Sequence, residues 1–360
     1  MAEEGILFIS IREKTTSAVK VRVKYFKHAL ETNGYNVVSY ELNLGGFKTY
    51  TSYLLRLPPR DLDKVSKKAK LIMTTSPPVL NAIISYKVAL RHKLPLIVDV
   101  RDIWEEYAKT SHSLASRLGI IDRLVKEYYE ALRYASKIFV VTELMKHYYE
   151  NVLNVKDKIV VISNGTDSDI IRCDQKVKRR KDLVYLADLD RPYHNLEFLL
   201  EALRDGTLNL MIIGDGRYLS GIKKYAQKLG IADKVEFVGW VPYENLKEYL
   251  CTAKVGVVGR PFVDNIEYLY TIPVKTYDYL AAGLPVVGYG PKNSALEDFI
   301  KKNAIGAYVA QPDPGILLKE LTNLVQEHEK YIERARELAI NFDRKKLAQK
   351  MVDVVKEVLA

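Results

Sequence analysis

The feature that most constrains this chain is an alternation of short apolar runs with longer amphipathic stretches along most of its 360 residues. Apolar runs of strand length are typical of strands that are buried on both faces, as in a parallel sheet. The amphipathic stretches between them are typical of helices that cover such a sheet. The alternation therefore predicts an α/β fold, and the chain is longer than one ordinary domain.

The alternation falls into two series. In the first, we expect strands at residues 5–10, 70–75, 95–100, 137–142 and 158–163, with helices near 18–33, 79–91, 121–134 and 143–152. A polar, strongly charged segment follows at residues 167–182, and the alternation restarts at Leu183. In the second, we expect strands at 183–186, 208–213, 234–238, 255–258, 285–288 and 306–309, and two long polar helices at 315–339 and 344–359. The charged segment predicts a domain boundary between residues 166 and 167, with a second domain at 167–343.

Composition limits the compartment. Hydrophobic residues make up 48% of the chain and charged residues 28%, and no apolar run has the length of a membrane span. Acidic residues precede the first apolar run, unlike in a secretory signal, so we expect a cytoplasmic protein. Only Cys173 and Cys251 occur, which argues against a disulfide framework and a cysteine-based zinc site, and favours a reducing compartment.

The formal net charge is +10. It predicts an anionic partner, such as nucleotide phosphates, a polyanionic acceptor or the headgroups of a membrane surface, while a generically basic surface explains it equally well. No stretch interleaves basic and aromatic residues in the way that would make nucleic acid the leading expected partner.

One stretch, residues 273–287 (PVKTYDYLAAGLPVV), is the most informative about chemistry. Pro273 suits the first turn of a helix and Gly283 its left-handed C-terminal cap. Lys275 and Asp278 are three residues apart and share one helix face. Lys275 could hold a diphosphate, and Asp278 could accept hydrogen bonds from a ribose diol. From the spacing alone, an ordinary ion pair on an amphipathic helix is the alternative.

This stretch resembles the donor-site helix of the retaining GT-B glycosyltransferases of family 4, the group 1 glycosyltransferases. It matches the pattern Pro-x-Lys-x-x-Asp/Glu-Tyr-x-Ala-x-Gly-x-Pro-Val. Other segments resemble family motifs and follow in the same order: residues 98–104 (VDVRDIW), 161–167 (VISNGTD), 211–216 (MIIGDG) and 235–242 (VEFVGWVP). Together they cover nearly the whole chain.

The resemblance implies the GT-B fold, in which two Rossmann-like doubly wound domains face a central cleft. The last helix resembles one that crosses back to the first domain, so residues 344–360 are expected to complete domain 1–166. It also implies sugar transfer from a nucleotide-diphosphate sugar to a glycan or lipid-linked acceptor, with retention of anomeric configuration. The leaving diphosphate can take the acceptor proton, and no cofactor or obligatory metal ion is expected besides the nucleotide-sugar co-substrate.

The resemblance also assigns residues to the donor. The diphosphate clamp falls to Lys275 and Arg191, with Arg260 as a third cation, whereas His194 stands about where a lysine is usual. A neutral histidine cannot replace a fixed charge at pH 7. The other expected donor contacts are Asp278, the turn at Gly214 and Gly216, the backbone near Val241, Tyr270 in place of a usual glutamate, and Glu267 as its substitute. An exposed loop glutamate is an equally fair reading of Glu267.

The remaining assignments lie on the acceptor side. Arg101 stands where many relatives have a histidine, and arginine stays protonated, so we expect an electrostatic contact there, with Asp102 as its partner or as an acceptor-side group. Asn164 in the turn between the domains and Lys14 in the N-terminal loop are the other expected acceptor-side residues. The expected catalytic set is Lys275, Arg191, Arg101 and Asp102.

The segment 42–59 and the type of activity each have more than one interpretation. The segment 42–59 mixes aromatic, apolar and basic residues, which suits either peripheral contact with an anionic membrane or a partly buried helix on the first domain. The same architecture also houses nucleotide-sugar epimerases, and the altered clamp with Tyr270 would suit a regulatory homologue without activity.

Overall fold

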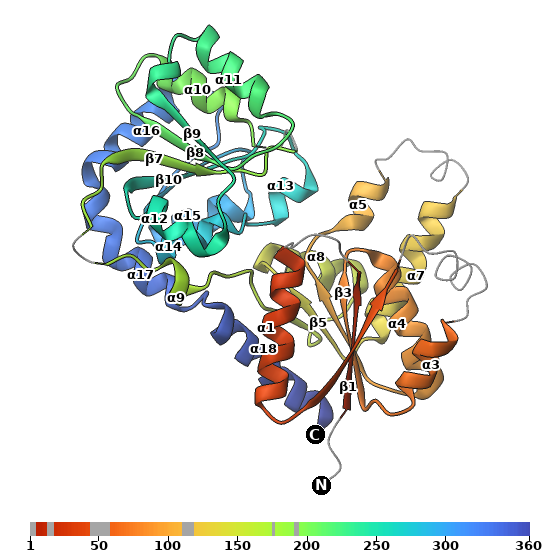
Figure 1. The fold of residues 1–360 in the computed structure, drawn as a ribbon. Helices are drawn as coiled ribbons and strands as arrows, with labels where there is room; N and C mark the ends of the chain where they lie inside the picture. Colours follow the sequence, from red (N-terminus) through yellow and green to blue (C-terminus); the bar gives the residue numbers. More distant parts are fainter. Residues whose placement is uncertain (1–4, 13–17, 44–57, 110–118, 175–176, 191–193) are drawn as a thin grey trace. The chain divides into compact units, whose positions relative to one another are not determined.

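The structure, a computed structural model, describes residues 5–12, 18–43, 58–109, 119–174, 177–190 and 194–360. The chain divides into two compact units (Figure 1). The N-terminal unit comprises Met1–Ser163 with Arg344–Ala360, and the C-terminal unit comprises Asn164–Asp343. Among the described helices, none combines the length and the apolar character that a membrane-spanning helix needs.

The N-terminal unit is built on a six-stranded sheet whose neighbouring strands run parallel, in the order β2-β1-β3-β4-β5-β6. Its strands are β1 (Gly5–Ile11), β2 (Asn36–Leu42), β3 (Leu71–Ser76), β4 (Leu96–Val100), β5 (Lys137–Val140) and β6 (Ile159–Val161). Its helices are α1 (Ala18–Thr32), α3 (Arg60–Ser66), α4 (Val79–His92), α5 (Trp104–Lys109), α7 (Ile120–Tyr134), α8 (Glu143–Leu153) and α18 (Arg344–Leu359).

Helices α1 and α18 pack side by side on one face of this sheet (Figure 1). Phe26 of α1 and Met351 of α18 are buried against Phe8 and Phe139 of the strands. Burial of these apolar side chains explains why the last helix of the chain belongs to the first unit.

The C-terminal unit repeats the architecture with a six-stranded sheet in the order β12-β11-β10-β7-β8-β9, again with parallel neighbours. Its strands are β7 (Lys181–Leu186), β8 (Leu210–Ile213), β9 (Val235–Gly239), β10 (Ala253–Gly259), β11 (Val286–Tyr289) and β12 (Gly306–Val309). Its helices are α9 (Ser168–Ile171), α10 (Leu196–Arg204), α11 (Leu219–Lys228), α12 (Leu246–Leu250), α13 (Ile266–Tyr270), α14 (Lys275–Ala281), α15 (Ala295–Asn303), α16 (Pro314–Glu327) and α17 (Ile332–Ile340). The predicted α/β class is confirmed.

The helix expected at residues 315–339 is interrupted. Helix α16 ends at Glu327, a 3₁₀ turn spans His328–Tyr331, and α17 follows. The ring nitrogen Nδ1 of His328 lies 2.9 Å from the carbonyl oxygen of Val325, at the point where the backbone tightens. Short 3₁₀ turns of this kind commonly join helices, and nothing in the polar sequence pattern marks this one.

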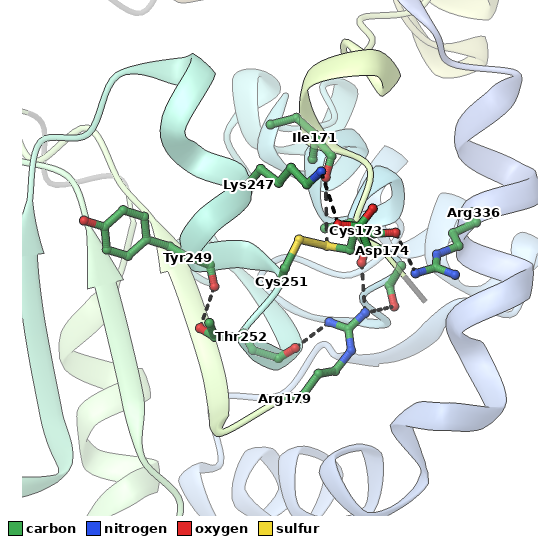
Figure 2. Close-up of a disulfide and its surroundings, with 12 residues drawn as sticks. Ile171, Cys173, Asp174, Arg179, Lys247, Tyr249, Cys251, Thr252 and Arg336 are labelled. Atoms are coloured by element: carbon green, nitrogen blue, oxygen red, sulfur yellow. Dashed lines mark hydrogen bonds and ion pairs between the residues drawn. A yellow bond between two sulfur atoms is a disulfide. The ribbon is translucent and has the colours of Figure 1, made fainter. Parts of the chain in front are cut away.

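The two cysteines are bonded to each other, so the expectation that they argue against disulfide bonding is wrong (Figure 2). Cys173, just after α9, pairs with Cys251, at the end of α12. Both side chains are buried, and their Cα atoms are 5.5 Å apart although the residues are 78 positions apart in sequence. The count of cysteines gave no indication of this proximity, because it is created by the tertiary fold.

Candidate functional site in the C-terminal unit

The candidate site lies at the carboxyl edge of the C-terminal sheet, where loops follow the adjacent strands β7 and β10. In open α/β sheets this edge is where ligands bind. The loop after β7 supplies Asp188 and His194, β10 is followed by Arg260, and helix α14 supplies Lys275. Three of the residues assigned from the sequence to the diphosphate region therefore lie in one neighbourhood: His194, Arg260 and Lys275.

Lys275 is held among ring systems and other charges. Its ammonium Nζ lies 3.4 Å from Nδ1 of His194 and 4.3 Å from the ring centroid of Tyr185. Burial lowers the pKa of Lys275 well below its ordinary value, the positive charge of Arg260 lowers it further, and the carboxylate of Asp188 raises it. Lys275 and Arg260 therefore lie close enough to interact, in surroundings that disfavour a positive charge on Lys275.

His194 is neutral in this environment. Burial, together with the charges of Lys275 and Arg260, lowers the pKa of His194 to about 2, although a hydrogen bond to the carbonyl oxygen of Asp188 opposes the shift. That bond is 2.8 Å long and involves Nε2. A carbonyl oxygen only accepts hydrogen bonds, so Nε2 carries the proton and Nδ1 presents a lone pair.

Two buried tyrosines fix the loop that carries His194. The hydroxyl of Tyr185 donates to the His194 carbonyl oxygen at 3.1 Å and accepts from the Gly259 amide at 3.1 Å. The hydroxyl of Tyr289 donates to the Asn195 carbonyl oxygen at 2.8 Å. Asn195 has a left-handed backbone conformation, with φ of +49°, which asparagine tolerates better than most residues.

Asp278 has different neighbours from Lys275. Its Oδ1 accepts hydrogen bonds from Oγ1 of Thr166 and from the hydroxyl of Tyr243, each at 2.8 Å. The same tyrosine hydroxyl accepts from the backbone amide of Asp167 at 3.1 Å. The carboxylate is buried, so this network ties α14 to the first residues of the C-terminal unit.

Gly214 and Gly216 are required by close packing of the backbone. Their φ angles are +141° and +146°. A Cβ atom on Gly214 would lie 1.8 Å from the Ala187 carbonyl oxygen, and one on Gly216 would lie 2.2 Å from the Leu189 carbonyl carbon. The close approach of the loop after β7 therefore accounts for both glycines without a ligand.

The remaining donor-side assignments lie around the same edge. Arg260 is buried, and its guanidinium carbon lies 5.3 Å from the ring centroid of Tyr268 in α13. Glu267 and Tyr270 are half-buried on this short helix, and Val241 is half-buried just after β9. Arg191 lies outside the described residues.

The acceptor-side assignments are more dispersed. In the N-terminal unit, Nη2 of Arg101 donates to the Pro77 carbonyl oxygen at 2.7 Å, and Asp102 is half-buried beside it in sequence. Asn164 is half-buried at the start of the C-terminal unit. Lys14 lies outside the described residues. So do positions 44–57 of the segment 42–59, which was expected either to contact an anionic membrane or to form a partly buried helix.

Asp99, the first acid of the 98–104 segment, has a structural role that sequence reasoning missed. It forms a bidentate pair with Arg22 of α1, with bonds of 2.9 and 2.8 Å, and both side chains are buried. Arg22 also donates to the carbonyl oxygens of Ile162 and Ser163. Such pairing satisfies a charge that would be costly to bury alone, and it anchors the end of the N-terminal unit before the chain leaves it.

Tyr185 and Tyr243 were missed as well. Tyr185 contacts Lys275, and Tyr243 comes directly after the 235–242 segment. The tyrosine hydroxyls act through contacts between distant segments, which no local pattern reveals. Among the described residues, no group of three or more histidine, cysteine, aspartate or glutamate side chains is arranged to hold a metal ion.

Comparison with known proteins agrees with this architecture. Residues 167–340 match the family described as glycosyl transferases group 1. No curated protein matches the chain.

Solved structures share the fold at low sequence identity. Sucrose-phosphate synthase from Thermosynechococcus elongatus matches with a TM-score of 0.77 and 14% identity, covering 99% of each chain. HepE of Anabaena, in complex with UDP, matches with a TM-score of 0.71 and 14% identity, covering 98% of this chain and 100% of that one. The lipopolysaccharide outer core galactosyltransferase WaaB matches with a TM-score of 0.70 and 13% identity, covering 98% and 99%. The chain thus has the GT-B fold of these solved structures, and its residues 167–340 are similar to the group 1 glycosyl transferases.

Proposed function

We propose that this chain moves a sugar from a nucleoside-diphosphate sugar to a glycan or lipid-linked acceptor, with retention of anomeric configuration. The observation that carries the proposal is the environment of Lys275, where burial and Arg260 both lower the pKa of the ammonium. A diphosphate would add negative charge beside Lys275 and Arg260 and so favour the protonated amine. Anabaena HepE has been solved with UDP and with UDP-glucose, which supports a donor of this class.

In this proposal the cations act on the leaving group. As the bond between the anomeric carbon and the diphosphate oxygen breaks, negative charge grows on the diphosphate, and Lys275 and Arg260 stabilise it. Preorganised charges aimed at developing charge are often the largest single contribution to catalysis. Arg191, which lies outside the described residues, is assigned to the same clamp from the sequence.

The acceptor hydroxyl attacks the same face of the sugar that the diphosphate leaves. Its oxygen forms the new bond to the anomeric carbon, and its proton passes to the leaving diphosphate oxygen, so no protein base is needed. Arg101 and Asp102 are assigned to electrostatic contact on the acceptor side, with Asn164 and Lys14.

The donor assignments keep Asp278 at the ribose hydroxyls. One of its oxygens already accepts from Thr166 and Tyr243, and a carboxylate offers about four acceptor sites in all. Glu267 and Tyr270 are assigned to the sugar, and the backbone near Val241 with the turn at Gly214 and Gly216 to the nucleotide. The C-terminal domain 167–343 is then the donor domain, and the N-terminal domain 1–166 with 344–360 the acceptor domain, working in the cytoplasm or at the cytoplasmic face of a membrane.

The test is incubation with a panel of nucleotide-diphosphate sugars, followed by NMR of the released or transferred sugar. We expect cleavage of at least one donor and a product whose anomeric proton coupling matches that of the donor. An inverted product would overturn the retaining mechanism. Release of free epimerised sugar would identify an epimerase, and neither binding nor cleavage of any donor would identify a regulatory homologue.

A further inference from the structure

We propose that His194 is a positioning residue: as a neutral hydrogen-bond acceptor, it holds the Lys275 ammonium in place for the donor diphosphate. The part concerning the diphosphate rests on the proposed function, whereas the contact with Lys275 does not. His194 was expected to weaken the clamp because it brings no fixed charge. Its contacts with Asp188 and Lys275 assign it the role of an oriented acceptor.

The imidazole is oriented by the backbone. Nε2 lies 2.8 Å from the carbonyl oxygen of Asp188, and this bond requires the proton to be on Nε2. The opposite ring nitrogen, Nδ1, must then be unprotonated. A hydrogen bond on one ring nitrogen setting the state of the other is how histidines are prepared for binding roles.

The lone pair on Nδ1 is directed to Lys275. The hydrogen-bond neighbours of Nδ1 include Lys275 Nζ at 3.4 Å and the Tyr185 hydroxyl at 3.5 Å. The Tyr185 hydroxyl has a shorter contact, 3.1 Å, with the His194 carbonyl oxygen. Its single proton is best placed in that shorter bond, which leaves the Nδ1 lone pair to the ammonium.

The side chains that contact the ammonium are buried. His194 is 6% exposed, and its ring meets the Tyr185 ring edge-on at 5.7 Å between centroids. The centroid of the Tyr185 ring lies 4.3 Å from Nζ of Lys275, so the Tyr185 ring and the His194 imidazole both contact the ammonium. A lysine side chain otherwise loses rotamer entropy when it is fixed by a ligand, and prior fixation reduces that cost.

A matched pair of substitutions separates the two ring nitrogens. Asparagine places an amide oxygen near the position of Nδ1, so His194→Asn keeps an acceptor for Lys275. Glutamine places its amide nitrogen near the position of Nε2, so His194→Gln keeps the donor to Asp188 and loses that acceptor. The His194→Asn variant is the conservative rescue.

The first readout does not involve any donor. Competitive amine labelling, read by peptide mass spectrometry, gives the reactivity of Lys275 relative to the exposed Lys228 in the same sample. We expect His194→Gln to raise the labelling rate of Lys275 by roughly fivefold or more, since a lost acceptor both frees the amine and disfavours its proton. We expect His194→Asn to stay near the wild-type rate. Equal rates in all three proteins would overturn the positioning role.

The second readout is the affinity for uridine diphosphate, measured by calorimetry. We expect binding about tenfold weaker in His194→Gln, and weaker by less than about threefold in His194→Asn. If the labelling result holds but no protein binds the nucleotide, the proposed function fails and the positioning contact stands. If the wild type and His194→Gln bind equally well, the link to the diphosphate is wrong.

A third measurement protects the test against misfolded variants. Long-range ¹H–¹⁵N spectra of the wild-type protein report which ring nitrogen of His194 carries the proton. Protonated Nε2 and unprotonated Nδ1 are expected. The opposite tautomer would overturn the proposal whatever the variants do.

Discussion

Lys275 and His194 contact each other in the candidate site. Both are placed where burial and neighbouring positive charge disfavour a proton on them. We assign Lys275 to bind a ligand through its ammonium group, whereas His194 is neutral and serves as a hydrogen-bond acceptor. The pair therefore places one amine beside one oriented acceptor.

At this residue scale, His194 predicts acid sensitivity. Its pKa is lowered from 6.5 to about 2 in the folded state, so the unfolded chain binds an extra proton between these values. Stability must then fall as the pH drops below 6.5, by at most about 1.4 kcal/mol per pH unit. Denaturant unfolding of the wild type and His194→Asn from pH 7 to pH 4 measures this, and the stability difference should shift steadily in favour of the variant. A difference that stays constant over that range would contradict the neutral, buried histidine.

At the scale of elements, the disulfide fastens the segment after α9 to the end of α12. Figure 2 shows Arg179 and Arg336 around it. Arg336 donates to the Cys173 carbonyl oxygen at 3.1 Å, and Arg179 donates to the Ala282 carbonyl oxygen at 2.9 Å, where α14 has just ended. The disulfide therefore lies beside Arg179, which hydrogen-bonds the backbone at the C-terminal end of α14, the helix that carries Lys275.

Reduction should destabilise the C-terminal unit. The bond joins residues 78 positions apart, and the chain-entropy model gives about 4.5 kcal/mol for a loop of that size. We expect the unfolding transition of the wild type to move to lower denaturant concentration in the presence of a phosphine reductant. A Cys173→Ala/Cys251→Ala variant is the control, because its transition should not respond to the reductant. An identical transition with and without reductant in the wild type would contradict a stabilising bond.

Elements were the level at which the sequence predicted most. Apolar runs such as those ending at Val100 and Ile213 report burial directly, so every strand except β2, and with them the α/β class, could be predicted from local pattern. The break at His328–Tyr331 and the pairing of Cys173 with Cys251 could not, because both depend on neighbours that the fold supplies. The same holds for the site: motif order drew attention to Lys275, while its contacts with His194 and Tyr185 come from separate loops and strands.

At the scale of the whole molecule, two α/β units with parallel sheets give the GT-B fold, and the family match falls on residues 167–340. The net charge of +10 suits anionic substrates, but it does not say where they bind. The contacts around Lys275 lead us to propose that the C-terminal unit binds a nucleoside diphosphate through this residue.

Calorimetric titration of uridine diphosphate into the wild type, Lys275→Ala and Lys228→Ala tests that claim most directly. Lys228 is an exposed lysine of α11 and serves as the control for loss of one positive charge. We predict that the wild type and Lys228→Ala bind equally, and that Lys275→Ala binds roughly tenfold to a hundredfold more weakly with its fold intact. Equal affinity of all three proteins would contradict the account.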